Sequence, residues 1–175
     1  PSWKHPSLYM QANYNCTVNL LDALYKMGSK AKFHIPGSGE EFGEIYENEL
    51  PIHEETVIRP VNPYAVSKVA QDLLGYQYFK SYGMKIIRTR GFNHTGNRRG
   101  EVFVTSNFAK QIVEVEKKLR EPVIYVGDLS AKRDFTHVRD MSRGYVMALE
   151  KGEIGEVYNL CSGKAYSIQE MLDKL

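Results

Sequence analysis

The sequence lacks the features of a membrane-spanning or disulfide-stabilised protein. Its 175 residues contain no apolar run near the roughly 20 residues that a transmembrane helix needs, and no charged-then-apolar leader opens the chain. Only two cysteines occur, Cys16 and Cys161, and they show neither C-x-x-C nor Cys/His spacing. We therefore expect a cytoplasmic protein, no membrane partner and two buried thiols.

An excess of charge of one sign is also absent. The chain has 23 Lys and Arg against 21 Asp and Glu, and these charges are interspersed, which argues against a nucleic-acid partner. Its five histidines show no H-x-x-x-H or H-E-x-x-H spacing, so we expect no metal site. The 42% hydrophobic and 25% charged residues are typical of a globular domain, and the length fits one domain or part of one.

The two ends of the sequence carry no start or stop signals. The chain begins at Pro1 rather than at a methionine. It stops at Leu175 within an amphipathic stretch that starts at Ser167 and shows no C-terminal glycine. We therefore expect a fragment of a longer protein.

Apolar periodicity predicts an alternation of strands and helices. One long helix is expected over residues 9–27 before Gly28, and another over 63–82 before Gly83. A proline-containing polar loop spans 44–63 between them. The predicted strands are at 31–36, 84–90, 123–126 and 157–160. A further helix is expected over 105–119, another follows the segment 132–140 and ends at about 149, and the last begins at 167. This order predicts an α/β domain with a parallel sheet.

Such sheets bind ligands outside the carboxyl ends of their strands, where Ser38 is expected to lie. Tyr64 and Lys68 are spaced i and i+4, which places them on one face of the predicted helix. A lysine ammonium beside a phenol lowers the pKa of the tyrosine, so Tyr64 is a candidate proton donor or acceptor and Ser38 a candidate ligand of the substrate oxygen. Taken alone, Y-x-x-x-K is a weak motif that also occurs on solvated helices.

The residues around this motif form a longer pattern. Ser38 lies five residues before Gly43, and Pro63 directly precedes Tyr64. Together with the Y-x-x-x-K spacing, this pattern resembles the extended short-chain dehydrogenase/reductases that modify nucleotide sugars. The likeness covers nearly the whole chain. Residues 13–17 are similar to the family's N-V-x-G-T helix, apart from a cysteine in place of glycine, and residues 158–163 are similar to its Y-N-x-x-S/G-G ending.

The resemblance implies a Rossmann-like, doubly wound parallel sheet with a smaller C-terminal substrate-binding part. Residues 1–92 would be the C-terminal half of the NAD(P)-binding domain and hold the catalytic residues. Residues 93–175 would be mainly the nucleotide-sugar-binding part, interleaved with the sheet and truncated. The first strands and the glycine-rich cofactor loop would precede the chain, so we expect these 175 residues alone to be poorly active.

Within the family, the segments 92–105 and 133–140 are similar to the GDP-sugar branch of reductases and dehydratases. The R-D-F-T-H-V-R-D of 133–140 is nearer the reductases, which reduce the 4-keto group of GDP-4-keto-6-deoxy-D-mannose. Glu40 stands where the GDP-mannose 4,6-dehydratases have their general base, so a dehydratase is an alternative. A UDP-sugar epimerase and a non-catalytic nucleotide-sugar-binding protein are further alternatives.

When the family's functional residues are carried over to the matching positions of this sequence, the resemblance implies a full site. The implied catalytic residues are Ser38, Glu40, Tyr64 and Lys68. The cofactor, NADP or NAD, would be bound by Tyr64, Lys68, Arg98 and Arg99, and the GDP-sugar by Asn93, Val104, Lys110 and Arg133. In a reductase, Tyr64 would protonate the C4 oxygen, Lys68 would tune Tyr64 and hold the ribose, and Ser38 would hold the oxygen. A homodimer or homotetramer is also implied, with the helices 9–27 and 63–82 at the dimer face.

Overall fold

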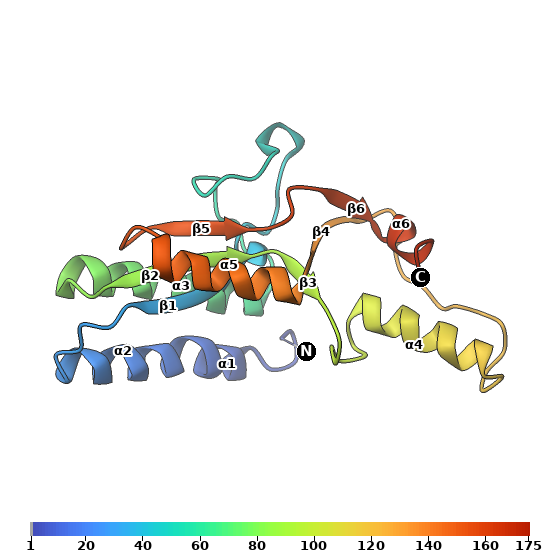
Figure 1. Ribbon diagram of the computed structural model, residues 1–175, viewed down its shortest axis with the longest axis horizontal. Coiled ribbons are helices and arrows are strands. Elements are labelled where there is room, and N and C mark those ends of the chain that lie inside the picture. Colours follow the sequence, from blue (N-terminus) through green and yellow to red (C-terminus); the bar gives the residue numbers. More distant parts are fainter. Residues whose placement is uncertain (1) are drawn as a thin grey trace. The chain divides into compact units, whose positions relative to one another are not determined.

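A computed structural model describes residues 2–175, and the chain divides into two compact units (Figure 1). The first unit runs up to Phe92 and also includes Met141–Leu160. Asn93–Asp140 and Cys161–Leu175 form the second unit. Each unit is built around its own three-stranded sheet.

The sheet of the first unit is parallel and has the order β1-β2-β5. Its strands are β1 (Phe33–Ser38), β2 (Ile86–Gly91) and β5 (Val157–Leu160). Every residue of β2 is buried, as expected for a central strand covered on both faces. Because Ser38 pairs with Gly91 and Gly91 with Leu160, the carboxyl ends of all three strands meet at one edge.

Two long helical segments of the first unit precede Phe92. The first is continuous through α1 (Pro6–Tyr9), a π-helical turn (Met10–Asn15) and α2 (Cys16–Lys26), so the helix predicted over 9–27 is confirmed with an earlier start. The helix predicted over 63–82 is confirmed as α3 (Pro63–Tyr82). Its start is capped by the Asn62 side chain, which accepts a hydrogen bond from the Ala65 N–H, and Gly83 ends it at a φ of 65°.

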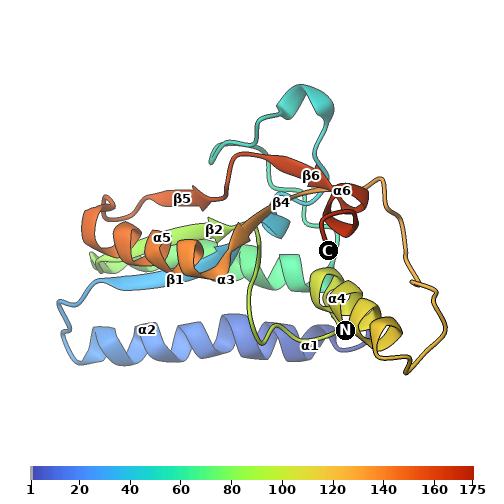
Figure 2. The ribbon, with the colours of Figure 1, turned by 45° about the vertical axis from the view of Figure 1, so that its right-hand side comes forward.

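Helices cover both faces of this sheet (Figure 2). On β1, Ile35 points toward Gly75 of α3, whereas the ring of the preceding His34 lies 4.9 Å from that of Tyr145 on α5 (Val138–Lys151). Successive strand residues point to opposite faces, so α3 and α5 lie on opposite sides of the sheet. The predicted Rossmann-type α/β arrangement is therefore confirmed. The core beneath α3 contains the buried side chains of Leu21, Ile35, Tyr78, Met84 and Ile86.

The second unit has a mixed sheet of the order β3-β4-β6. It consists of β3 (Asn93–Thr95), β4 (Lys132–His137) and β6 (Ala165–Ser167), with β3 parallel and β6 antiparallel to β4. These short strands were not predicted from the sequence. The unit also contains α4 (Val104–Glu116) and α6 (Ile168–Leu172), and a reciprocal Ser167–Glu170 capping box starts α6.

Two expectations are wrong. The strand predicted at 123–126 does not form, because the Gln111 side chain takes the place of a neighbouring strand: it accepts from the Tyr125 N–H at 2.8 Å and donates to its carbonyl at 3.0 Å. Cys16 and Cys161 are exposed, not buried.

Within residues 2–175, no helix is long and apolar enough to cross a membrane.

Candidate active site

Ser38 is fixed at the carboxyl end of β1 by a reciprocal capping box. Its hydroxyl accepts a hydrogen bond from the Glu40 N–H at 3.2 Å, and its own N–H donates to Oε1 of Glu41 at 2.7 Å. The short helix that follows, Gly39–Glu41, turns the chain away from the sheet. Ser38 is therefore buried and held at its backbone as well as at its side chain.

Tyr64 and Lys68 reach the same place from the first two turns of α3. The Tyr64 phenol lies close enough to the Ser38 side chain for that side chain to act on its pKa. The Lys68 ammonium donates to the carbonyl of Pro36 on β1 and to Oε1 of Gln71, both at 2.9 Å. Burial lowers the pKa of Lys68. The structure thus brings Ser38, Tyr64 and Lys68 together at the strand end.

The predicted effect of Lys68 on Tyr64 is wrong for this structure. The pKa of Tyr64 is raised above its ordinary value, chiefly by burial and also by the negative charges of Glu40 and Glu41, while the Ser38 side chain lowers it. Lys68 instead directs its ammonium at Pro36 and Gln71. A raised pKa keeps the phenol protonated at neutral pH, which suits a group that donates a proton.

Glu40 lies beside this trio with an exposed carboxylate. Its Oε2 accepts a hydrogen bond from Nδ2 of Asn62 at 3.0 Å. Because Asn62 also caps α3, the Glu40 carboxylate is tied to the start of the helix that carries Tyr64. A carboxylate in this position can accept a proton from a group bound near Ser38.

Sequence reasoning missed a group of four buried charges beneath the site. Arg90 donates from Nε to Glu41 at 3.1 Å and from Nη2 to Asp72 at 2.7 Å, and Arg88 donates to the other oxygen of Asp72 at 3.1 Å. Burial and the neighbouring Asp72 raise the pKa of Glu41 to about 7, although Ser38 and Arg90 oppose this. Two arginines in a run otherwise typical of a buried strand were the signal for buried acidic partners.

A polar cluster between the two N-terminal helical segments supports Lys68 from behind. Gln71, which accepts from Lys68, donates to the Thr17 hydroxyl at 2.7 Å. Asn13 donates to the Ser67 hydroxyl at 2.9 Å, and Ser67 donates to the carbonyl of Tyr64 at 2.7 Å. The segment 13–17, which carried part of the family resemblance, therefore braces the turn of α3 that holds Tyr64 and Lys68.

The second unit holds the remaining candidate residues. Asn93 on β3 is exposed and pairs in register with Phe135, two residues after the exposed Arg133 on β4. The Arg99 guanidinium lies 3.7 Å from the centre of the Phe103 ring, and burial lowers its pKa.

The other three candidates of this unit lie around α4. Arg98 is exposed at a φ of 69°, and Val104 is the first residue of α4. The ammonium of Lys110 is paired with Glu101 and lies 3.9 Å from Glu114. Lys110 is therefore already occupied by carboxylates in this structure.

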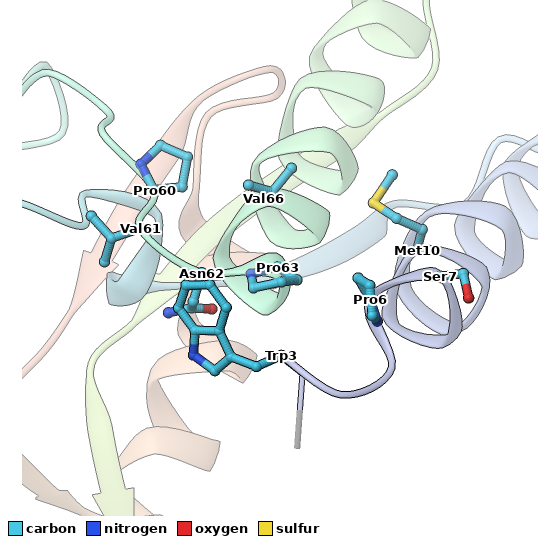
Figure 3. Close-up of a pocket in the computed structure, with 9 residues that line it drawn as sticks. All are labelled: Trp3, Pro6, Ser7, Met10, Pro60, Val61, Asn62, Pro63 and Val66. Atoms are coloured by element: carbon cyan, nitrogen blue, oxygen red, sulfur yellow. The ribbon is translucent and has the colours of Figure 1, made fainter.

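An apolar groove of about 490 Å³ lies beside the start of α3 (Figure 3). Trp3 reaches across it toward Asn62 and Pro63. Its lining consists of Trp3, Pro6, Ser7, Met10, Pro60, Val61, Asn62, Pro63 and Val66, which leaves out the Ser38–Tyr64–Lys68 trio.

In residues 2–175, no three or more His, Cys, Asp or Glu side chains are grouped to hold a metal ion.

Comparison with protein families identifies the chain. The sequence model of the GDP-mannose 4,6 dehydratase family matches residues 1–175. The chain belongs to this family. Its members are extended short-chain dehydrogenase/reductases, so the resemblance seen in the sequence is confirmed.

Individual relatives of the family include both reductases and dehydratases. The chain is 38% identical over 174 residues to GDP-6-deoxy-D-mannose reductase of Pseudomonas aeruginosa, an alignment that covers 99% of the chain and 57% of that protein. It is 30% identical to GDP-mannose 4,6-dehydratase of Vibrio cholerae, covering 98% of the chain and 46% of that protein. The chain therefore spans only about half the length of these relatives.

Solved structures of related proteins confirm the fold. RMD from Pseudomonas aeruginosa in complex with NADPH superposes with a TM-score of 0.94 at 38% identity, over 98% of this chain and 58% of that one. UDP-glucose 4-epimerase from Thermotoga maritima with UDP-glucose gives a TM-score of 0.87 at 26% identity, over 98% of this chain and 54% of that one. The architecture is thus common to reductases and epimerases that act on nucleotide sugars.

Proposed function

We propose that the protein is an NAD(P)H-dependent reductase of the 4-keto group of GDP-4-keto-6-deoxy-D-mannose. The observation that carries the proposal is the placement of the Ser38 side chain beside the Tyr64 phenol at the carboxyl end of β1, with Lys68 one turn further along α3 and bonded to β1. The 38% identity to the Pseudomonas reductase, over nearly the whole chain, supports the substrate class. The NADPH complex of RMD favours NADPH over NADH.

The trio fits a nicotinamide nucleotide, because the half-buried phenol and ammonium match the hydroxyl groups of its ribose. When bound, the cofactor supplies the hydride. In this proposal Tyr64, kept protonated by its raised pKa, donates a proton to the C4 oxygen. The Ser38 hydroxyl holds that oxygen, and Lys68 binds the ribose.

The GDP part of the substrate and the rest of the cofactor are assigned to residues of the second unit. Asn93 and Arg133 would contact the sugar diphosphate, since a guanidinium pairs with two phosphate oxygens at once. Val104 and Lys110 would contact the substrate as well, Lys110 by exchanging Glu101 for the substrate. Arg98 and Arg99 would bind the cofactor.

A GDP-mannose 4,6-dehydratase is the second candidate, and Glu40 is the observation that favours it. Its exposed carboxylate is held beside Ser38 by Asn62, at the place of a general base. In that reaction Tyr64 would act on C4 while Glu40 removed the C5 proton. The 30% identity to the Vibrio dehydratase supports this alternative.

We also propose that the protein assembles as a homodimer or homotetramer through α2 and α3. Leu20 on α2 is 55% exposed, and Leu73 on α3 is 53% exposed. Apolar side chains of this size on neighbouring helices favour a covered surface. The cytoplasm remains our predicted location.

The test of the catalytic assignment compares Tyr64→Phe with Tyr46→Phe in the complete gene product. Tyr46 is an exposed loop tyrosine, so its variant is the matched control. With the keto sugar and NADPH, we expect Tyr64→Phe to lose about 100-fold or more in kcat, since it lacks the proton donor, while NADPH still binds. A Tyr64→Phe enzyme with the rate of the control would contradict the assignment.

A further inference from the structure

A chain of buried contacts connects the backbone of Ser38 to the helix that carries Tyr64. The Ser38 N–H donates to Oε1 of Glu41 at 2.7 Å, and Oε2 of Glu41 accepts from Nε of Arg90 at 3.1 Å. Arg90 continues the chain by donating from Nη2 to Asp72 on α3 at 2.7 Å. Asp72 lies four residues after Lys68 and eight after Tyr64, so its position follows that of the catalytic turns.

These contacts are shielded from water and leave little room for adjustment. Glu41 is 0% exposed, Asp72 1% and Arg90 4%. Gly37 lets the carboxylate come close, because a Cβ there would lie 2.4 Å from Oε1 of Glu41. The remaining Arg90 nitrogen donates to the Glu54 carbonyl at 2.9 Å, so the guanidinium is held at all three nitrogens.

Stability alone does not explain such an arrangement. Hydrophobic residues of similar size can replace a buried ion pair with little loss of stability, because the pair carries a large desolvation cost. What a hydrophobic pair cannot supply is an acceptor for the Ser38 N–H. That N–H belongs to the same residue whose hydroxyl contacts the Tyr64 phenol.

We propose that Glu41 and Arg90 are positioning residues, which hold the Ser38 backbone at a fixed place relative to Tyr64 and Lys68 on α3 through Asp72. The role rests on the proposed function of the trio, since it sets the geometry in which the Ser38 hydroxyl and the Tyr64 phenol meet one substrate oxygen. A displacement of about 1 Å between such groups can cost on the order of 100-fold in rate.

The decisive variant is the double substitution Glu41→Leu with Arg90→Met in the complete gene product. It removes one negative and one positive charge, and Asp72 keeps Arg88 as its partner. We expect the variant to fold with a melting temperature below that of the parent, because the buried Ser38 N–H is left without an acceptor, and to keep an unchanged Kd for NADPH. With the keto sugar, kcat should fall about 10- to 100-fold, while KM changes much less, because the Ser38 backbone has lost its acceptor.

A second variant, Glu41→Gln, keeps the shape of the side chain. The amide NH₂ must face either the Ser38 N–H or the Arg90 Nε–H, so one of the two hydrogen bonds is lost. The variant also removes a negative charge that raises the pKa of Tyr64. The other groups that act on Tyr64 are Ser38 and Glu40 from the strand-end loop and Tyr145 from α5, and the Tyr9 ring packs against it with its centre 6.0 Å away. The alkaline limb of the kcat profile should therefore shift to lower pH.

Glu44→Gln is the matched control, because it makes the same charge change at an exposed site three residues away. It should leave kcat and its pH profile unchanged. A double variant that folds and keeps the parental kcat would overturn the positioning role. If the double variant does not fold, parental kcat and an unshifted alkaline limb in Glu41→Gln would overturn it instead.

The proposed function and the positioning role fail in different ways. A parent enzyme that leaves the keto sugar unreduced but converts GDP-mannose contradicts the reductase function alone. In that case the kcat of the double variant is compared with the kcat of the parent using GDP-mannose as substrate, and this comparison decides the positioning role. Loss of rate in the double variant supports the role in either reaction, since both need the Ser38–Tyr64 geometry.

Discussion

The distance between α3 and β1 is set by Gly75, and a pair of substitutions tests this directly. A Cβ at Gly75 would come within 2.3 Å of Cδ1 of Ile35 and 3.3 Å of Cγ2 of Ile86. Ile35 is only 1% exposed, so its Cδ1 cannot turn out into solvent. Gly75→Ala therefore forces a shift at this contact, either of the buried Ile35 side chain or of the helix that carries Tyr64 against the strand that ends at Ser38.

The magnitudes follow from opposing effects. Overpacking a core costs about 1–3 kcal/mol, whereas alanine gains about 1 kcal/mol over glycine in helix propensity. We expect Gly75→Ala to lower the free energy of unfolding by about 1 kcal/mol on balance. Ile35→Val alone removes the clashing Cδ1 and should cost about 1 kcal/mol through the cavity that it leaves.

Combining the two substitutions should restore stability. The methyl group introduced by Gly75→Ala then occupies the space left by Cδ1 of Ile35, and the helix keeps its gain in propensity. We expect the double variant to unfold within about 0.5 kcal/mol of the parent, a coupling energy of about 2 kcal/mol. The assay is urea denaturation of the complete gene product and its three variants. Strictly additive losses, near 2 kcal/mol in the double variant, would refute the close approach of Gly75 to Ile35.

Two further predictions concern other parts of the chain. The pKa of Glu41 is raised from 4.5 to about 7, so the folded state holds this proton more tightly than the unfolded state. The free energy of unfolding of the parent, relative to that of Glu41→Gln, should therefore be greatest below pH 4.5 and fall as the pH rises through about 7. Urea denaturation across that pH range measures this difference. A difference that grows with pH would contradict this direction. Gln111→Leu should speed hydrogen exchange of the Tyr125 amide, since that N–H loses its acceptor, and unchanged protection would show that Gln111 does not hold the 123–126 segment.

Local signals explain why the first unit was well predicted. Helix α3 has Pro63 in its first turn and Gly83 just after its end, so both boundaries are indicated by neighbouring residues. The Ser38–Tyr64–Lys68 trio was predicted from local patterns as well, namely the i,i+4 spacing, the strand-end position and the family resemblance that they carry, because the spacing alone is a weak signal. Tertiary structure then only had to bring two such patterns together.

Non-local partners explain what was missed. The run at 123–126 has the composition of a strand, yet Gln111 satisfies the Tyr125 backbone where a strand would need a neighbour. The strands β3 and β6 are three residues each, too short to show a period. Glu41 lies 49 positions from its partner Arg90 in the sequence, and no pattern within the loop shows that its carboxylate is buried.

The predicted direction of the Tyr64 pKa shift was wrong for an electrostatic reason. The sequence shows that Lys68 is near Tyr64, but the direction of its ammonium depends on the Pro36 carbonyl, which belongs to another element. Burial of the phenol and the charges of Glu40 and Glu41 also arise only on folding. A spacing argument therefore located the trio and misjudged its electrostatics.

The most direct test of the proposed reductase is the fate of the cofactor. The complete gene product is incubated with GDP-4-keto-6-deoxy-D-mannose and NADPH, and separately with GDP-mannose and a catalytic amount of NADP⁺, while the reduced cofactor and the sugar products are measured. We expect NADPH to be oxidised in equal amount to the keto sugar reduced, and GDP-mannose to remain unchanged. Keto sugar formed from GDP-mannose without net change of the cofactor would contradict the reductase and support the dehydratase, in which Glu40 is the proposed base.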